Sequence, residues 1–444
     1  MSYYTLPKKI IDVEFDPLIT NSHDCIAPII SYSLCNYLTS MNEQFKKIRD
    51  SDLYISHMED DNVLFFLNKA INPYEFIFTK VPSSKLSVSK LKPHSNLFYI
   101  LMEIVNNFNL LDGFYDKNIK TLSYGANADS IIEFMNIFRE ESSDIHLKSN
   151  ICIENSKIIF NETNEHFREE TYNFLYYELH DKDYLINKNY ITGFIYILCN
   201  LLYYQSADGV SIIKIDNIYY KPIVEIMYIL TSIYDKVHII KPTLANAVTN
   251  ERYIICKNFI VNSQKTKLYA MYFANLGFLL KTLKEEEQTV SLLKNELPYY
   301  FINKLEELNI IIGHQQLEFM DQLISLYKNK NKEDKIETLK KNNIQKCIQW
   351  CDKFKIPYNK FTDKVNIFLN GDKSSNESSE NIFLSYRNTT ESNNCIVHSF
   401  EETFSDQEFE HDFDPEFEPE LGLGFGLDLE LDLELGLNQE PEPF

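Results

Sequence analysis

The sequence lacks the patterns on which several common classes of protein depend. No Gly-x-x-x-x-Gly-Lys-Ser/Thr loop occurs, which argues against a P-loop nucleotide triphosphatase. The 8 cysteines form no Cys-x-x-Cys pair and the 10 histidines form no His-x-His or His-x-x-x-His pair, so we expect neither a disulfide framework nor a metal site. The chain also has no run of about 18 apolar residues and no basic segment followed by an apolar one at its start. We therefore expect an intracellular, cytoplasmic protein without a membrane span.

Negative charge is concentrated at one end of the chain. The formal charge is −22, from 43 Lys and Arg against 65 Asp and Glu, but residues 400–444 hold 16 of the acids and no Lys or Arg, which leaves −6 for the rest. A body near neutrality argues against a strongly basic nucleic-acid binder and leaves room for a local basic groove. We expect residues 366–444 to form a disordered acidic tail, which could recruit a basic protein partner.

Hydrophobic periodicity predicts alternating strands and helices. Apolar residues from Leu97 to Phe108 repeat with the spacing of one helix face, which predicts a helix over 96–110. A strand over 119–124, Gly125 and a further helix follow, as at the start of a βα unit. The same alternation predicts an extended segment at 150–159, strands at 174–179, 210–216, 236–240 and 252–259, and helices at 184–204 and 218–234.

The last two predicted strands are joined by too short a segment to be parallel, so they must pair antiparallel. A mostly parallel α/β sheet that ends in such a hairpin is the arrangement of the Rossmann-like S-adenosylmethionine-dependent methyltransferase fold. We predict an N-terminal region at 1–91, a methyltransferase core at 92–260, a helical C-terminal layer at 261–365 and the acidic tail at 366–444.

The segment 208–259 carries the most specific motifs. Lys214 ends a strand that follows Gly209, Lys241 and Pro242 close the next strand, and Glu251 with Tyr253 opens the last. In this order the sequence resembles the FtsJ-like (RrmJ-type) ribose 2′-O-methyltransferases, including the relatives found in large DNA viruses. The alternative is that Lys214 and Glu251 have no common function, Lys214 being an exposed residue at a strand end and Glu251 a residue of a turn.

The resemblance implies a catalytic set. A ribose hydroxyl is a poor nucleophile, and a lysine held by carboxylates can accept or orient its proton. By resemblance, Lys214 would be the central catalytic lysine and Glu251 its carboxylate partner. Asp181 is our choice for the family's aspartate, and Glu178 is the alternative within the preceding strand. A distance above about 10 Å between the Lys214 amine and the Glu251 carboxylate would exclude the catalytic interpretation.

Two positions depart from the family pattern. Ile100 stands where the first catalytic lysine is expected, and Lys85, Lys90 or Lys92 could replace it from the preceding segment. The loop that should bind S-adenosylmethionine reads Ala128-Asp-Ser-Ile131, with its glycine at Gly125, instead of a Gly-Gly sequence. Glycine there would let the backbone approach the cofactor carboxylate.

Two functions remain open. The resemblance implies a methyltransferase that uses S-adenosylmethionine on an RNA ribose, plausibly near an mRNA cap, with its activity weakened or lost by these departures. The alternative is a catalytically inactive methyltransferase fold that serves as an RNA-binding or scaffolding subunit. Lysines and aromatic residues interleave over 74–99, which suits phosphate contacts and base stacking and equally suits a core strand beside a solvated linker. A viral origin would place the protein in a virion or viral factory.

Overall fold

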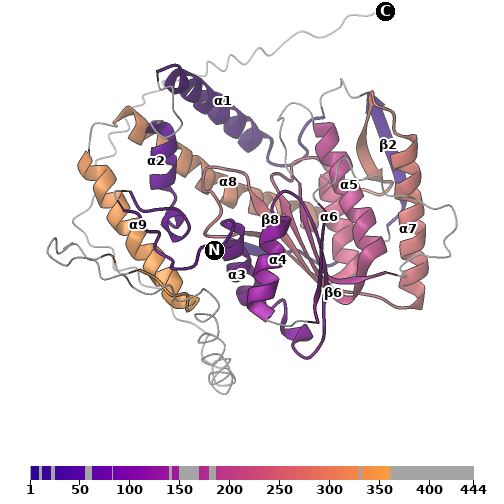
Figure 1. Cartoon of the computed structure of the whole chain (residues 1–444). Coiled ribbons are helices and arrows are strands. Elements are labelled where there is room, and N and C mark those ends of the chain that lie inside the picture. Colours follow the sequence, from indigo (N-terminus) through magenta and orange to yellow (C-terminus); the bar gives the residue numbers. More distant parts are fainter. Residues whose placement is uncertain are drawn as a thin grey trace, which may run out of the picture. The chain divides into compact units, whose positions relative to one another are not determined.

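The computed structural model describes residues 2–9, 13–21, 26–55, 63–82, 84–139, 143–149, 170–179, 187–329, 333–359 and 361. Figure 1 shows the arrangement of their helices and strands. The strands are β1 (Ser2–Thr5), β2 (Phe15–Asn21), β3 (Lys120–Tyr124), β4 (Ile145–Ser149), β5 (Tyr172–Glu178), β6 (Gln205–Ile215), β7 (Tyr234–Lys241), β8 (Arg252–Phe259) and β9 (Glu287–Leu293). The α-helices are α1 (Tyr32–Ile55), α2 (Val63–Ile71), α3 (Leu97–Phe108), α4 (Ala128–Arg139), α5 (Asn187–Tyr204), α6 (Lys221–Ile233), α7 (Ser263–Thr282), α8 (Tyr299–Lys328) and α9 (Glu333–Lys353).

The described part of the chain contains a seven-stranded sheet with the order β1-β7-β8-β6-β5-β3-β4. Strands β3 to β7 run in one direction, since β3 is parallel to both β4 and β5, β5 is parallel to β6, and β8 is antiparallel to both β6 and β7. This mainly parallel sheet, with one antiparallel strand inserted between β6 and β7, is typical of the methyltransferase fold. The predicted fold class and the predicted hairpin are confirmed.

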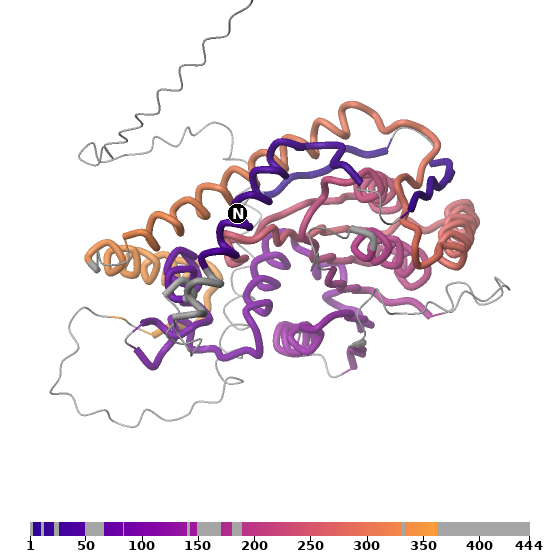
Figure 2. The backbone as a smooth tube through the Cα atoms, turned by 90° about the horizontal axis from the view of Figure 1, so that it is seen from above, coloured from indigo at the N-terminus to yellow at the C-terminus, as the bar shows by residue number. Residues whose placement is uncertain are grey.

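Helices cover both faces of the sheet. On one face, α3 and α4 pack against Ile212 of β6 and Ile255 of β8. On the other face, α5, α6, α7 and α8 pack against Ile213 of β6 and Ile254 of β8. Because side chains alternate along a strand, neighbouring residues of one strand serve the two opposite cores. Figure 2 shows α3 and α4, in purple, on the opposite side of the strands from the orange α8.

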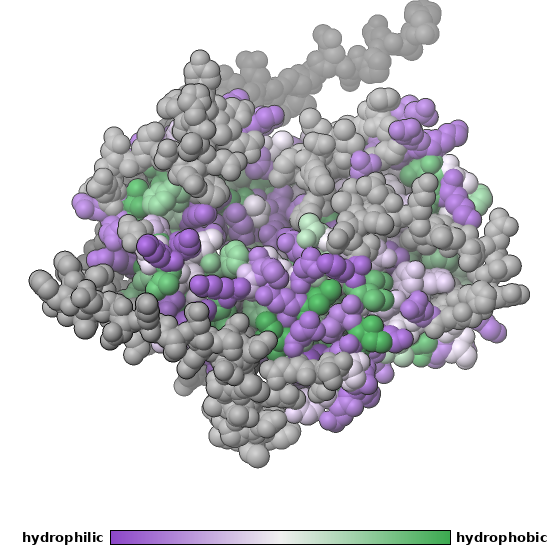
Figure 3. Space-filling model, in the orientation of Figure 1, coloured by the Kyte–Doolittle hydropathy of each residue, from purple (hydrophilic) through white to green (hydrophobic). Residues whose placement is uncertain are grey.

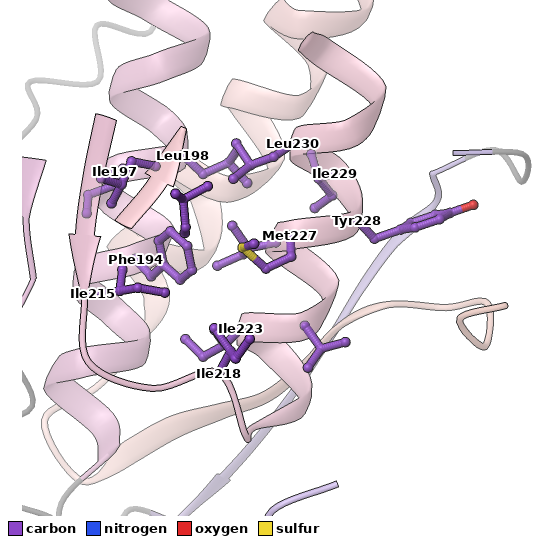
Figure 4. Close-up of a cluster of buried hydrophobic side chains, with 14 of the residues drawn as sticks. Phe194, Ile197, Leu198, Ile215, Ile218, Ile223, Met227, Tyr228, Ile229 and Leu230 are labelled. Atoms are coloured by element: carbon purple, nitrogen blue, oxygen red, sulfur yellow. The ribbon is translucent and has the colours of Figure 1, made fainter. Parts of the chain in front are cut away.

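Helix α6 is a core helix. Every residue from Pro222 to Ile233 is buried, as expected for a helix that is apolar all round. Pro222 lies in its first turn, where a missing backbone N–H costs nothing. Figure 4 shows apolar side chains of α6, among them Met227 and Leu230, facing Phe194 and Leu198 of α5. Burial of each such side chain stabilises the fold by roughly 1.5–3 kcal/mol.

A second, two-stranded sheet joins the N-terminal region to the C-terminal layer. Strand β2 pairs antiparallel with β9. The prediction of a helical layer at 261–365 is wrong for β9. Its residues Gln288, Thr289 and Ser291 are polar yet buried, so no apolar pattern distinguishes this strand from its helical surroundings. The predicted extended segment at 150–159 and the predicted acidic tail at 366–444 lie outside the described residues.

The surface is mixed in character. In the described part of the face drawn in Figure 3, hydrophobic residues form small areas interspersed with hydrophilic ones. Among the described helices, none combines the length and the apolar composition that crossing a membrane requires.

Candidate functional site

The structure brings Lys214 and Glu251 together at the carboxyl edge of the sheet. Lys214 is the penultimate residue of β6, and Glu251 directly precedes β8, which runs antiparallel beside it. The Lys214 Nζ lies 3.4 Å from the Glu251 Oε1, and the two side chains are 14% and 17% exposed. This distance is far below the limit that the catalytic interpretation sets, so the two residues form a shielded ion pair.

A tyrosine fixes the carboxylate of this pair. Tyr253 lies opposite Lys214 in the β6–β8 register, and its hydroxyl donates a hydrogen bond of 2.6 Å to the Glu251 Oε1. Burial, followed by the charge of Glu251, raises the pKa of Tyr253 well above its usual value, so Tyr253 stays a donor. The Glu251 Oε1 is therefore held by two groups, the neutral Tyr253 hydroxyl and the Lys214 amine.

Glu178 supplies a second carboxylate beside the pair. It ends β5 and is the register partner of Lys214 on β6. The Tyr176 hydroxyl donates to the Glu178 Oε1 at 2.8 Å, and burial followed by Glu178 raises the pKa of Tyr176 well above its usual value. Asp181, our choice from the sequence, lies outside the described residues. Among the described residues, Glu178 is the acid at the end of β5, and its role stays a prediction.

Glu178 also closes over the turn that follows β3. Gly125 has φ +128°, a conformation that favours glycine, and a Cβ built on it would lie 2.6 Å from the Glu178 Oε2. The Asn127 side chain donates to the Glu178 Oε1 at 2.9 Å, and the Asn127 backbone N–H donates to the Oε2 at 3.4 Å. No sequence motif marks Asn127, because a lone asparagine shortly after a glycine is ordinary in a turn.

This turn is the position where the resemblance places S-adenosylmethionine. A cofactor carboxylate would need the backbone N–H groups at the start of α4 and the space over Gly125. The Glu178 carboxylate lies in that space and accepts the Asn127 N–H, so a second carboxylate would meet like charge at short range. In this arrangement the residues present do not fit the cofactor. Asp129, in the first turn of α4, is paired with Lys148 of β4.

Helix α3 contains no lysine that could take the place of the family's first catalytic lysine. Ile100 is 3% exposed and packs in the core between α3, α4 and the sheet. One turn later, Glu103 is buried and its carboxylate accepts from the Thr243 backbone N–H and hydroxyl, at 2.9 to 3.2 Å. Burial raises the pKa of Glu103, and the hydrogen bonds from Thr243 oppose that shift. The three alternative lysines, Lys85, Lys90 and Lys92, are all exposed.

Lys241 is the last residue of β7. It does not belong to the Lys214–Glu251 ion pair. Its Nζ donates to the Thr249 carbonyl. Burial and then the charge of Arg252 lower the pKa of Lys241 to about 7, while Glu251 and Asp216 act in the opposite direction. Lys241 of the Lys241-Pro242 motif therefore lies against the loop between β7 and β8, and its pKa is lowered there.

No protein-family model matches the chain, and no curated protein sequence matches it. Among solved structures, the chain is similar to a protein of Plasmodium falciparum described as a ribosomal RNA methyltransferase, with 17% identity, 38% of this chain and 99% of that chain covered and a TM-score of 0.28. It is also similar to the plantazolicin methyltransferase BpumL in complex with SAH, with 12% identity, 58% of this chain and 100% of that chain covered and a TM-score of 0.21.

The order and direction of the strands define the protein as one with the S-adenosylmethionine-dependent methyltransferase fold. Its membership in the FtsJ-like family stays a prediction. Among the described residues, no group of three or more His, Cys, Asp and Glu side chains is placed to hold a metal ion. The candidate site consists of the Lys214–Glu251 ion pair and the neighbouring Glu178, and a tyrosine hydroxyl donates to each of the two carboxylates.

Proposed function

We propose that this protein is an RNA-binding member of the methyltransferase fold that does not transfer a methyl group. The single observation that carries this proposal is the position of Glu178, whose carboxylate lies over Gly125 and accepts the Asn127 N–H. Through that contact the Glu178 carboxylate occupies the start of α4, where the carboxylate of a bound cofactor would otherwise lie. Lys214 and Glu251 then form a structural ion pair at the bottom of the former catalytic edge.

The buried position of Ile100 supports the loss of catalysis. The family's four-residue set uses two lysines, and an isoleucine packed in the core can neither orient nor deprotonate a ribose hydroxyl. Lys214 forms its ion pair with Glu251, and no second lysine stands where the family has its first one. The remaining set is therefore suited to holding the sheet edge together.

Exposed lysines support the binding of RNA. Lys80, Lys85, Lys90 and Lys92 are exposed, whereas the aromatic residues interleaved with them, such as Phe76 and Tyr99, are buried. The aromatic side chains therefore serve the core, and the lysines alone remain for contacts with phosphates. This stretch leads into α3. Asn96, directly before that helix, donates to the Leu244 carbonyl in the loop after β7. The basic stretch thus adjoins the carboxyl edge of the sheet.

A second candidate function is RNA ribose 2′-O-methylation, and the Lys214–Glu251 pair favours it. In that case Lys214 would orient the ribose hydroxyl and accept its proton, and Glu251, fixed by Tyr253, would hold the ammonium group. Glu178 would first have to leave the Gly125 turn.

Calorimetric titration of S-adenosylmethionine and S-adenosylhomocysteine into the full chain separates the two functions. We expect no heat of binding and no thermal shift at millimolar ligand. A dissociation constant in the micromolar range, about −8 kcal/mol, would overturn the proposal and favour the second candidate. Fluorescence anisotropy with a labelled single-stranded RNA tests the other half, because a chain that shows no salt-dependent binding would not be an RNA-binding protein.

A further inference from the structure

Arg252, the first residue of β8, is buried without an ionic partner. Its exposed fraction is 0%. Its one hydrogen bond runs from Nη1 to the Asn309 Oδ1 of α8. The Nε and Nη2 groups, which share the other edge of the guanidinium plane, have no hydrogen-bond partner among the described residues. Arg252 thus lies behind the candidate site, on the sheet face covered by α8.

Arg139 shows how this chain satisfies a buried arginine elsewhere. It is 8% exposed. Its Nε donates to the Asp144 Oδ2 at 2.6 Å and its Nη2 to the Asp144 Oδ1 at 3.4 Å. The remaining donors reach the carbonyls of Phe114 and Lys117. In Arg139 the Nε–Nη2 edge therefore binds both oxygens of one carboxylate, which is the geometry that guanidinium groups favour.

Among the described residues, no carboxylate is hydrogen-bonded to the Nε–Nη2 edge of Arg252. The Asn309 Nδ2 and the Tyr219 hydroxyl are buried and have no hydrogen-bond partner among the described residues. Burial raises the pKa of the Tyr219 hydroxyl, and the neighbouring Arg252 guanidinium opposes that shift. Burial and then the charge of Arg252 lower the pKa of Lys241. Burial of an unpaired charge is strongly unfavourable, as is burial of unsatisfied donors.

We propose that the Nε–Nη2 edge of Arg252 binds a small oxyanion of the carboxylate or phosphate type, with Asn309 and Tyr219 as additional donors. Such an anion supplies two oxygens at the spacing of the guanidinium edge, neutralises its charge and accepts the remaining hydrogen bonds. A water molecule would satisfy one or two of these donors and would leave the charge uncompensated. Inorganic phosphate and acetate are the two probes, and they distinguish a phosphate ligand from a carboxylate ligand.

The first test uses the unaltered protein. Arginine labelled with ¹⁵N gives one Nε–H signal for each of the 5 arginines. Arg139 and Arg252, which are buried in the described part of the chain, should exchange slowly with solvent. We expect one slowly exchanging signal to shift on titration with phosphate or acetate, and not with sodium chloride at equal ionic strength. The Arg139→Lys variant identifies the other slow signal. If neither buried signal moves with either oxyanion, the proposal is overturned and Arg252 is solvated by water alone.

The second test is thermal unfolding of the full chain. We expect the midpoint to rise with the logarithm of phosphate or acetate concentration in the wild type and in Arg139→Lys. In Arg252→Lys, which keeps the charge and loses the planar edge, the apparent affinity should fall at least about tenfold. An Arg252→Lys protein that responds like the wild type would refute the site. Should that variant fail to fold, the resonance titration of the wild type still decides the question.

Discussion

Glu178 and Lys214 are register partners at the carboxyl ends of two adjacent parallel strands, β5 and β6. Lys214 is also ion-paired with Glu251 from the antiparallel strand on its other side. Lys214 is thus paired with one carboxylate, and a second carboxylate follows from the neighbouring strand at the same level of the sheet. These three residues lie at the ends of three neighbouring strands, at the edge where methyltransferase folds bind their ligands. Replacement of each residue should therefore have its own effect on ligand binding or stability.

Removal of the Glu178 side chain should reopen the cofactor position. In Glu178→Ala the space over Gly125 and the Asn127 N–H both become free, so we expect weak binding of S-adenosylhomocysteine where the wild type shows none. Glu178→Gln keeps the volume and removes the charge. Calorimetry on the three proteins separates the two effects, since binding by the glutamine variant would assign the exclusion to charge and binding by the alanine variant alone would assign it to volume. If all three proteins bind equally, Glu178 does not control access.

The Lys214–Glu251 pair should contribute more to stability than an exposed pair. A double-mutant cycle with Lys214→Met and Glu251→Gln should give a coupling energy of at least about 1 kcal/mol, because both side chains are shielded from solvent. The control is the Lys8–Asp235 pair, whose Nζ–Oδ1 distance is 2.6 Å but whose side chains are 63% and 40% exposed. We expect less than about 0.5 kcal/mol there. Equal couplings in urea unfolding would show that the Lys214–Glu251 pair has no special shielding.

Gly125 should tolerate no side chain. Gly125→Ala adds a Cβ at φ +128° that would lie within 3 Å of three Glu178 atoms, so we expect a loss of about 1–3 kcal/mol in the free energy of unfolding. Gly113→Ala is the matched control, since its Cβ would meet nothing within 4 Å, and its effect should stay within about 1 kcal/mol. Adding Glu178→Ala to Gly125→Ala should restore only part of the loss. Complete restoration would show that the backbone conformation itself is not strained.

The exposed lysines before α3 should set the salt dependence of RNA binding. Replacement of Lys85, Lys90 and Lys92 by alanine should weaken binding and reduce the slope of log affinity against log salt by about 2, as expected for three lost phosphate contacts to a single strand. A control with Lys267, Lys281 and Lys294 replaced has the same change in net charge on other elements. Anisotropy titrations between low and moderate salt give both slopes. Identical slopes would assign RNA binding to general electrostatics.

Acid should destabilise the fold through His238. Burial, and then Lys257 and Lys236, lower the pKa of His238 from 6.5 to about 4. As pH falls below about 6.5 the unfolded chain takes up a proton on this residue while the folded chain does not, so stability decreases until pH about 4. Buried carboxylates such as Glu103, whose pKa is raised, act with the opposite sign. We therefore expect urea unfolding to show a smaller loss between pH 7 and 5 in His238→Asn than in the wild type. An equal loss would exclude His238 as a cause.

Most of the sheet could be predicted because each strand and helix carries its own pattern. The strands at β3, β5, β6, β7 and β8 and the helix α3 all follow local hydrophobic periodicity. The pairing of β7 with β8 followed from the short segment between them. Strand β1 and strand β4 were not predicted, because short strands at a sheet edge need little apolar sequence.

The candidate site was predictable only where residues lie close in sequence to a strand end. The resemblance to the FtsJ-like family singled out Lys214 and Glu251 at such positions, and the structure brings them together. The contact of Glu178 with Gly125 joins residues 53 positions apart, and no local pattern encodes which acid near the end of β5 turns toward that glycine. The roles of the site residues, the FtsJ-like assignment and the domain boundaries stay predictions.

Strand β1 determines how this chain can be shortened. Its residues Ser2 to Thr5 pair with Lys241 to His238 and so complete the hydrogen bonding of β7. The backbone continues the contact through the Leu6 N–H, which donates to the Val237 carbonyl. A chain that began after residue 6 would present the backbone groups of β7, next to the Lys241-Pro242 motif, as a template on which the corresponding strand of a second molecule could assemble. The first six residues therefore cover β7 and transfer the edge of the sheet to a strand of four residues, which offers a shorter template.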